Sequence, residues 1–144
     1  MRRTKRCLLN MALMLGIILI MSACGSDNGT SVKYKGVTYN GEGTTKTMVS
    51  VVIQNEDEVL FLQQIKIIDD SPTVWKALEA ISKNEEQGLK IEKDAQGHIS
   101  KINNQQNDEQ RQWVLLIDNM QAEGNVEVME LGEDQNVTLS YEGK

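Results

Sequence analysis

Thiols, proline and aromatic residues are scarce in this chain of 144 residues, which has two cysteines, one proline, one phenylalanine and two tryptophans. Both cysteines, Cys7 and Cys24, lie near the N-terminus, so the rest of the chain has no thiol for a disulfide, a zinc–thiolate site or a nucleophile. We therefore expect a small core of Val, Ile, Leu and Met, which is stabilised by packing alone.

The residues from which active sites are usually built are also rare. His98 is the only histidine, and as a lone histidine in a predicted hairpin it is expected to be a surface residue. The sequence contains no Gly-x-Ser-x-Gly motif, no glycine-rich phosphate loop and no dinucleotide fingerprint. These absences indicate a non-catalytic protein rather than an enzyme.

Basic residues are too few to balance the acidic ones. From residue 24 onward the chain has 11 basic and 21 acidic side chains, a formal charge of −10. A negative surface repels phosphate backbones, so we expect no nucleic-acid partner. The same charge keeps the protein body away from anionic membrane surfaces.

The N-terminal segment has the pattern of an export signal. Basic residues at positions 2–6 precede an uncharged apolar run at 11–21, which is too short for a membrane-spanning helix. Residues 20–24, Ile-Met-Ser-Ala-Cys, resemble the lipobox of bacterial lipoproteins, with Met21 in place of the usual leucine. The resemblance implies that residues 1–23 are removed and that Cys24 is acylated. The chain would then be lipid-anchored at the extracellular face of the bacterial cell membrane. The alternative is an ordinary secretory signal with an incidental cysteine.

Residues 24–47 are rich in Gly, Ser, Thr and Asn, which predicts a flexible tether after the lipidated cysteine. Within it, residues 32–39 alternate apolar and polar side chains for a few positions. This piece could add an edge strand to the domain, but its glycine and short length favour a linker.

From residue 48 the pattern is typical of a folded domain. Val49, Val51 and Ile53 alternate along a strand. Ser71 before Pro72 predicts a helix start with Ser71 as N-cap, and helical spacing of apolar residues extends this helix over 72–84. Further strands are expected over residues 59–68, 89–93, 98–102, 113–117, 126–131 and 137–141. The continuous apolar run at 113–117 predicts a strand buried on both faces. This order predicts an α+β domain over 48–144, with one helix packed on one mixed sheet.

Several short motifs occur in an order that resembles a known family. The helix start matches a Thr-Val-x-x-Ala-Leu pattern, and residues 113–119 match a Trp-to-Asn strand end in which Met120 replaces the usual glycine. Gly132 matches a Gly-Asp turn before the last strand, with Glu133 placed ahead of Asp134. Together they resemble a β-grasp domain of unknown function from surface proteins of Gram-positive bacteria, which is similar to the C-terminal domain of transcobalamin and intrinsic factor. The resemblance covers residues 48–144 and implies a β-grasp-like fold and a corrinoid-like ligand.

Two groups of residues are candidates for a binding site. The first is a set of apolar and strand-end residues that could seat a flat ligand or a partner protein: Trp75, Trp113, Asn119 and Met120. For Trp75 the competing interpretation is a residue that covers the edge of a small core. The second group comprises acidic loop residues that could bind a divalent cation: Glu56, Asp57, Glu58, Asp69 and Asp70. Solvated surface charge is the competing interpretation, and a helix dipole also explains an acidic pair at 69–70.

These observations lead to one functional prediction and two alternatives. We expect a monomeric, non-catalytic, membrane-anchored binding module that captures a small molecule or a surface partner. The alternatives are a divalent-metal-binding protein that uses the acidic loops and a structural or adhesive module. The sequence fixes no cofactor, and the two candidates are a divalent cation and a corrinoid-like ligand.

Overall fold

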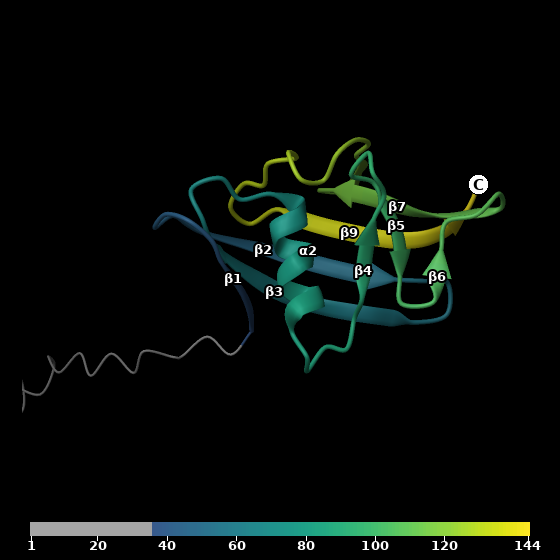
Figure 1. Ribbon diagram of the computed structural model, residues 1–144, viewed down its shortest axis with the longest axis horizontal. Helices are drawn as coiled ribbons and strands as arrows, with labels where there is room; N and C mark the ends of the chain where they lie inside the picture. Colours follow the sequence, from purple (N-terminus) through teal and green to yellow (C-terminus); the bar gives the residue numbers. More distant parts are fainter. Residues whose placement is uncertain (1–35) are drawn as a thin grey trace, which may run out of the picture. The chain divides into compact units, whose positions relative to one another are not determined.

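The computed structural model describes residues 36–144, where it has a six-stranded sheet, one helix and a three-stranded sheet (Figure 1). The predicted signal, residues 1–23, and the lipidation site Cys24 lie outside the described residues. Within the described part of the chain, no helix is long and apolar enough to cross a membrane.

The larger sheet has the strand order β1-β3-β2-β9-β7-β8. Its strands are β1 (Val37–Asn40), β2 (Lys46–Gln54), β3 (Val59–Ile68), β7 (Arg111–Ile117), β8 (Met120–Gln121) and β9 (Asn136–Gly143). β2 and β3 form an antiparallel hairpin, and β9 lies parallel to β2 in the middle of the sheet. With one helix across this mixed sheet, the fold is α+β and β-grasp-like, which confirms the predicted fold class. The chain has a second, three-stranded sheet where a single sheet was predicted.

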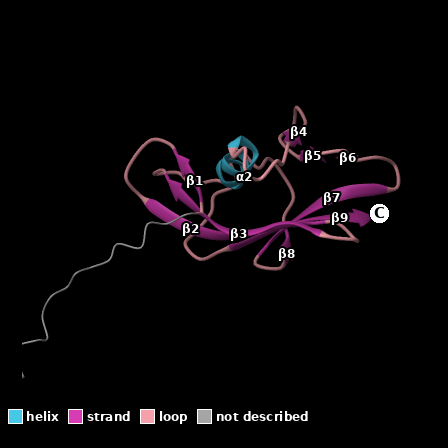
Figure 2. Cartoon of the chain, turned by 90° about the horizontal axis from the view of Figure 1, so that it is seen from below, coloured by secondary structure: helices cyan, strands magenta, loops and turns pink. Residues whose placement is uncertain are grey.

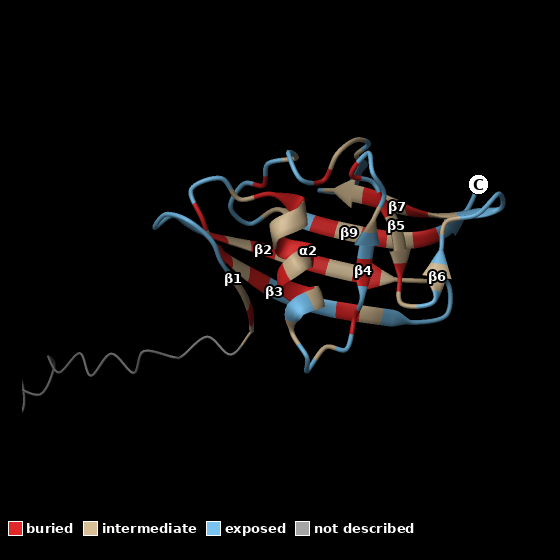
Figure 3. Cartoon of the chain, in the orientation of Figure 1, coloured by how far each residue is buried: buried red, intermediate tan, exposed pale blue. Residues whose placement is uncertain are grey.

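The helix α2 (Val74–Lys83) lies across one face of the larger sheet (Figure 2). Its buried residues follow helical spacing: Val74, Ala77, Leu78, Ala80 and Ile81. On β2 every second side chain from Thr47 to Ile53 is buried, while the residues between them are half-buried (Figure 3). These two periods bring the apolar faces of helix and sheet together, and their burial forms the core.

The smaller sheet has the order β4-β5-β6, with β4 (Ile91–Lys93), β5 (Ile99–Ile102) and β6 (Gln105–Gln106). It lies on the same side of the larger sheet as α2 (Figure 2). Its buried residues Ile91, Ile99 and Ile102 extend the core beyond the helix.

The helix begins two residues later than the sequence suggested. Thr73, not Ser71, is the N-cap, since its side chain accepts the backbone N–H of Lys76 at 3.4 Å. Thr73 has an extended backbone and pairs with Glu130 in an isolated bridge, which prevents the helix from starting at Pro72. The prediction of Ser71 as N-cap is therefore wrong by two residues.

The preference for a linker over residues 32–39 is wrong for the part that the structure describes. Val37–Asn40 form β1, which pairs in parallel with residues 65–68 of β3 at one edge of the sheet. Val37 is only 2% exposed, so its burial explains why this short segment joins the sheet. The folded part therefore includes residues that were predicted as tether up to residue 47, and β2 itself begins at Lys46.

Residues 126–131 were expected to form a strand but form a turn with a single bridge residue, Glu130. The carbonyl groups of this segment are used elsewhere, because the backbone N–H of Val74 donates to the Met129 carbonyl and that of Trp75 to the Val126 carbonyl. The first-turn N–H groups of a helix have no partner within it. The segment thus satisfies the start of α2 instead of pairing with a strand.

β7 matches the predicted strand but is not buried on both faces. Trp113 and Leu115 are buried, whereas Val114 and Leu116 are half-buried. The helix and the smaller sheet cover only one side of the larger sheet, so the second face of β7 stays partly accessible to solvent.

Candidate functional site

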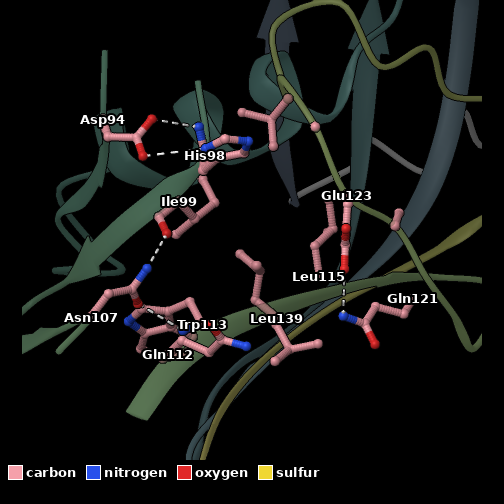
Figure 4. Close-up of a pocket in the computed structure, with 14 residues that line it drawn as sticks. Asp94, His98, Ile99, Asn107, Gln112, Trp113, Leu115, Gln121, Glu123 and Leu139 are labelled. Carbon is pink, nitrogen blue, oxygen red and sulfur yellow. Dashed lines mark hydrogen bonds and ion pairs between the residues drawn. The ribbon is translucent and has the colours of Figure 1, made fainter. Parts of the chain in front are cut away.

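A cavity of about 310 Å³ lies where the smaller sheet faces β7 and β9 of the larger sheet. Its lining residues come from the β4–β5 turn, β5, the β6–β7 loop, β7, β9 and the segment 121–126. Figure 4 shows Asp94 and His98 on one side, Gln121 and Glu123 on another, and Leu115 and Leu139 between them. The volume is at the small end of the range typical of ligand pockets.

The floor of this cavity is apolar and rigidly held. Trp113 is 7% exposed, and its ring nitrogen donates to the Gln105 carbonyl at 2.9 Å. The Trp113 ring lies 5.1 Å from that of Tyr141, whose hydroxyl donates to the Gln106 carbonyl. Each ring is therefore held by a hydrogen bond as well as by packing.

The rim of the cavity carries polar groups. Asp94 Oδ1 accepts the backbone N–H groups of Gln96 and His98, both at 2.9 Å. The His98 N–H is the main cause that holds the pKa of Asp94 below its usual range, while burial acts in the opposite direction. His98 Nδ1 lies 3.3 Å from Asp94 Oδ2. Since Asp94 stays ionised and can only accept, the imidazole must be the donor in this contact.

Asn107 connects the rim to both sheets. Its side-chain nitrogen donates to the Ile99 carbonyl at 2.9 Å, and its oxygen accepts the backbone N–H of Trp113 at 2.8 Å. On the other side of the cavity, Gln121 Nε2 donates to Glu123 Oε1 at 3.2 Å. These polar residues were not singled out from the sequence, where they belong to loops without a motif.

Among the predicted ligand-binding residues, only Trp113 lines this cavity. Trp75 is half-buried on α2, where Lys93 Nζ lies 4.8 Å from the centre of its ring. Its indole packs against the core, as the competing interpretation of Trp75 expected. The structure thus places the two tryptophans in different environments.

Asn119 and Met120 lie in the hairpin between β7 and β8. Asp118 and Asn119 both have positive φ angles, 51° and 64°, and Ile117 pairs with Met120 across the turn. This geometry is that of a two-residue hairpin turn, for which Asn is a favoured residue. Met120 is 71% exposed and does not line the cavity.

The two acidic groups do not meet. Residues 56–58 form the turn before β3 and residues 69–70 follow its last residue, so a strand of ten residues, about 33 Å long, separates them. Glu56 pairs with Arg111 at 2.6 Å. In the part of the chain that the structure describes, no group of three or more His, Cys, Asp or Glu side chains could hold a metal ion.

Asp69 and Asp70 are occupied by the fold itself. Asp69 is 5% exposed, and its carboxylate accepts the Lys76 ammonium at 2.6 Å and the backbone N–H groups of Ser71 and Glu42. Asp70 Oδ1 accepts the hydroxyl and backbone N–H of Thr45 and the N–H of Thr44. These bonds lower the pKa of both carboxyls, chiefly through Lys76 for Asp69 and the Thr45 hydroxyl for Asp70.

No model of a known protein family and no curated protein matches this chain. Among solved structures, the fold is similar to haptocorrin in complex with Cbi, with a TM-score of 0.58 and 14% sequence identity. That match covers 72% of this chain but 27% of haptocorrin, so the chain spans about a quarter of the length of that protein. It is also similar to a candidate metal-binding protein from Ruminococcus gnavus ATCC 29149, with a TM-score of 0.49, 14% identity and coverage of 68% and 98%. At 14% identity the likeness to haptocorrin concerns the fold alone.

Proposed function

We propose that this protein is a non-catalytic binding module, lipid-anchored at Cys24 on the extracellular face of a bacterial membrane, that captures a small molecule in the cavity beside β7. The observation that supports this proposal most directly is the cavity itself, with a fixed aromatic floor and a polar rim. Such a combination is characteristic of small-molecule sites.

The volume of the cavity limits the size of the ligand that it can enclose. A volume of about 310 Å³ corresponds to roughly ten water molecules, at ~30 Å³ for each. A whole corrinoid macrocycle is far larger, so a corrinoid-like ligand would insert only one peripheral group. We therefore favour a compact ligand of about ten non-hydrogen atoms, or one such group of a larger molecule.

The divalent-cation alternative has less support from the geometry. Asp69 and Asp70 already accept hydrogen bonds from the neighbouring chain, and a cation would have to displace Lys76 from Asp69. Metal ions still belong in the binding test, because carboxylates of exposed loops bind hard cations in many proteins.

The test uses the full-length protein in detergent with the substitution Trp75→Phe, which leaves Trp113 as the only tryptophan. Its fluorescence is titrated with compact aromatic and aliphatic compounds, Cbi, haem, Ca²⁺, Mg²⁺ and Zn²⁺, and thermal unfolding is followed in parallel. We expect at least one compact compound to change Trp113 emission and to raise the melting temperature, since a ligand at 100 times its Kd stabilises by about 2.7 kcal/mol.

Two matched variants locate the binding event. Ala122→Phe places a phenyl group at the cavity wall, whereas Val128→Phe places one on the neighbouring turn, where Val128 is 74% exposed. We expect the first to abolish the response and the second to leave it unchanged, with both variants folded by circular dichroism. The proposal would be overturned if no compound changed the Trp113 emission and the melting temperature. It would also be overturned if Ala122→Phe and Val128→Phe gave the same response to a compound.

A further inference from the structure

We propose that the cavity beside β7 selects a cationic ligand, an apolar body that carries a protonated amine or a similar donor-rich head. This inference rests on the proposed function, because it names the chemical class of the molecule that the cavity would bind. Three features of the lining support it: the sign of its charges, the engagement of the nearby cations and the hydrogen-bonding character of its rim.

The charge of the lining has one sign. Asp94 and Glu123 both line the cavity, and no lysine or arginine does. The carboxylates come from different segments, and Figure 4 shows them on different sides of the cavity. Across residues 36–144 the chain has 20 acidic and 9 basic side chains, so the wider field also attracts cations.

Two lysines of the smaller sheet are engaged with partners other than Asp94 and Glu123. Lys93 pairs with Glu127 at 3.1 Å and lies over the Trp75 ring. Lys101 pairs with Glu92 at 3.5 Å. In the structure these two side chains are held by their own partners and do not pair with the carboxylates of the rim. Asp94 is already contacted by His98, so Glu123 is the rim carboxylate more open to a cationic ligand.

The rim presents acceptors toward a ligand. Glu123 accepts one bond from Gln121 through Oε1, and its carboxylate has room for further donors because two oxygens offer about four lone-pair sites. His98 donates through Nδ1 to Asp94, so in the neutral imidazole Nε2 is an acceptor. A ligand with an ammonium head satisfies such groups, whereas a carboxylate head would face like charges without a donor side chain of opposite sign.

The floor accommodates the remainder of the ligand. Trp113, Leu115 and Leu139 are each less than 9% exposed and line the cavity below the rim. An aryl or short alkyl body packed on the accessible part of this floor leaves water, and the burial of apolar surface contributes to the affinity. The charged rim then decides which head group is accepted.

The experiment compares three compounds that share one body and differ in the charge of the head: phenethylamine, 2-phenylethanol and phenylacetate. Binding is measured by Trp113 fluorescence and by thermal shift in the full-length Trp75→Phe protein at low and at high salt. We expect affinity to fall from the amine to the alcohol to the acid, and the preference for the amine to shrink at high salt, where exposed charges are screened.

Two substitutions test the role of the rim. Glu123→Gln removes an exposed charge with little effect on folding, and we expect it to weaken the amine two- to fivefold while the alcohol is unaffected. Asp94→Asn should act in the same direction, but Asp94 also accepts two backbone N–H groups of its turn. Glu123→Gln therefore keeps the test decisive if the Asp94 variant is poorly folded.

The outcomes separate this inference from the proposed function. If the alcohol or the acid binds as tightly as the amine, or if Glu123→Gln weakens all three equally, the cationic class is overturned while the cavity stands as a binding site. The same conclusion follows if the amine does not bind but another compact compound does. If no compound of any charge binds, both proposals fail together.

Discussion

The carboxylate of Asp69 joins the end of β3 to the start of α2. One oxygen accepts the Lys76 ammonium and the backbone N–H of Ser71, and the other accepts the N–H of Glu42 from the loop after β1. The close approach of this loop requires glycine at position 41, because a Cβ there would lie 1.9 Å from Asp69 Oδ2. An acid with three such donors has a structural role that explains its position without a metal ion.

The first prediction concerns the acid sensitivity of folding. Hydrogen bonding to Lys76 lowers the native pKa of Asp69 from its usual value of 3.8. The stability that this group contributes is therefore present above that value and is lost as the pH falls through the lowered native pKa. We expect Asp69→Asn to reduce the free energy of unfolding at pH 7, with the difference from the natural protein closing as the pH drops below about 4.

Urea unfolding at a series of pH values measures this difference. Asp57→Asn serves as the control, because Asp57 lies in the exposed turn between β2 and β3, and it should leave the pH profile unchanged. A gap between the Asp69 variant and the natural protein that stays constant from pH 7 to pH 2 would contradict the explanation.

Single residues of the candidate site differ in how far the sequence reveals them. Trp113 opens an apolar run, so its burial could be predicted, and the structure places it on the cavity floor. His98 was predicted to be a surface residue, and the structure confirms that it is exposed, at the rim of the cavity. The available sequence signal for its hydrogen bond was an acid, Asp94, placed four residues earlier across a glycine turn. Its place beside β7 depends on tertiary packing, which no local pattern encodes.

At the scale of elements, periodicity succeeded where one face of a segment is buried. The alternation in residues 49–53 and the helical spacing in 74–81 identified β2 and α2, because each packs a single face on the core. The segment 126–131 shows the limit of this reasoning. It alternates like a strand, yet Val128 is 74% exposed and the carbonyls of Val126 and Met129 cap the helix. Because α2 starts at Val74, the carbonyl groups of this segment accept the first N–H groups of the helix instead of pairing with another strand.

The second prediction distinguishes the two candidate N-caps of α2. Thr73 accepts the N–H of Lys76 through its hydroxyl, so Thr73→Ala should destabilise the protein by about 1 kcal/mol. Ser71→Ala should change the free energy of unfolding by less than about 0.5 kcal/mol, as expected for a surface substitution. Denaturant unfolding of the two variants side by side is the measurement. Equal losses, or a larger loss at Ser71, would restore the cap position expected from the sequence.

For the molecule as a whole, the boundary of the domain is the point where composition misled the prediction most. Residues 36–47 are polar and glycine-rich, as in a linker, but they supply β1 and the loop that wraps the Asp69 and Asp70 carboxylates. A buried residue such as Val37 adds little to the average composition of a window. It nevertheless gives the segment a fixed place, since β1 pairs with β3 over four residues.

The third prediction follows from this boundary and compares two shortened chains, 36–144 and 48–144. The longer one keeps β1, the whole of β2 and the donors to Asp69 and Asp70, so it should unfold cooperatively. The shorter one loses Val37, whose full burial is worth about 1.5–3 kcal/mol. It also starts two residues inside β2 and leaves the β3 edge without β1. For a domain of this size that loss is a large share of the total stability, so the shorter chain should melt at a clearly lower temperature or fail to fold.

Circular dichroism melts of the two chains at matched concentration provide the measurement. Amide exchange of residues 65–68 provides the internal control, because these amides should exchange faster only where β1 is missing. Identical melting curves for the two chains would show that residues 36–47 are dispensable, as a tether would be.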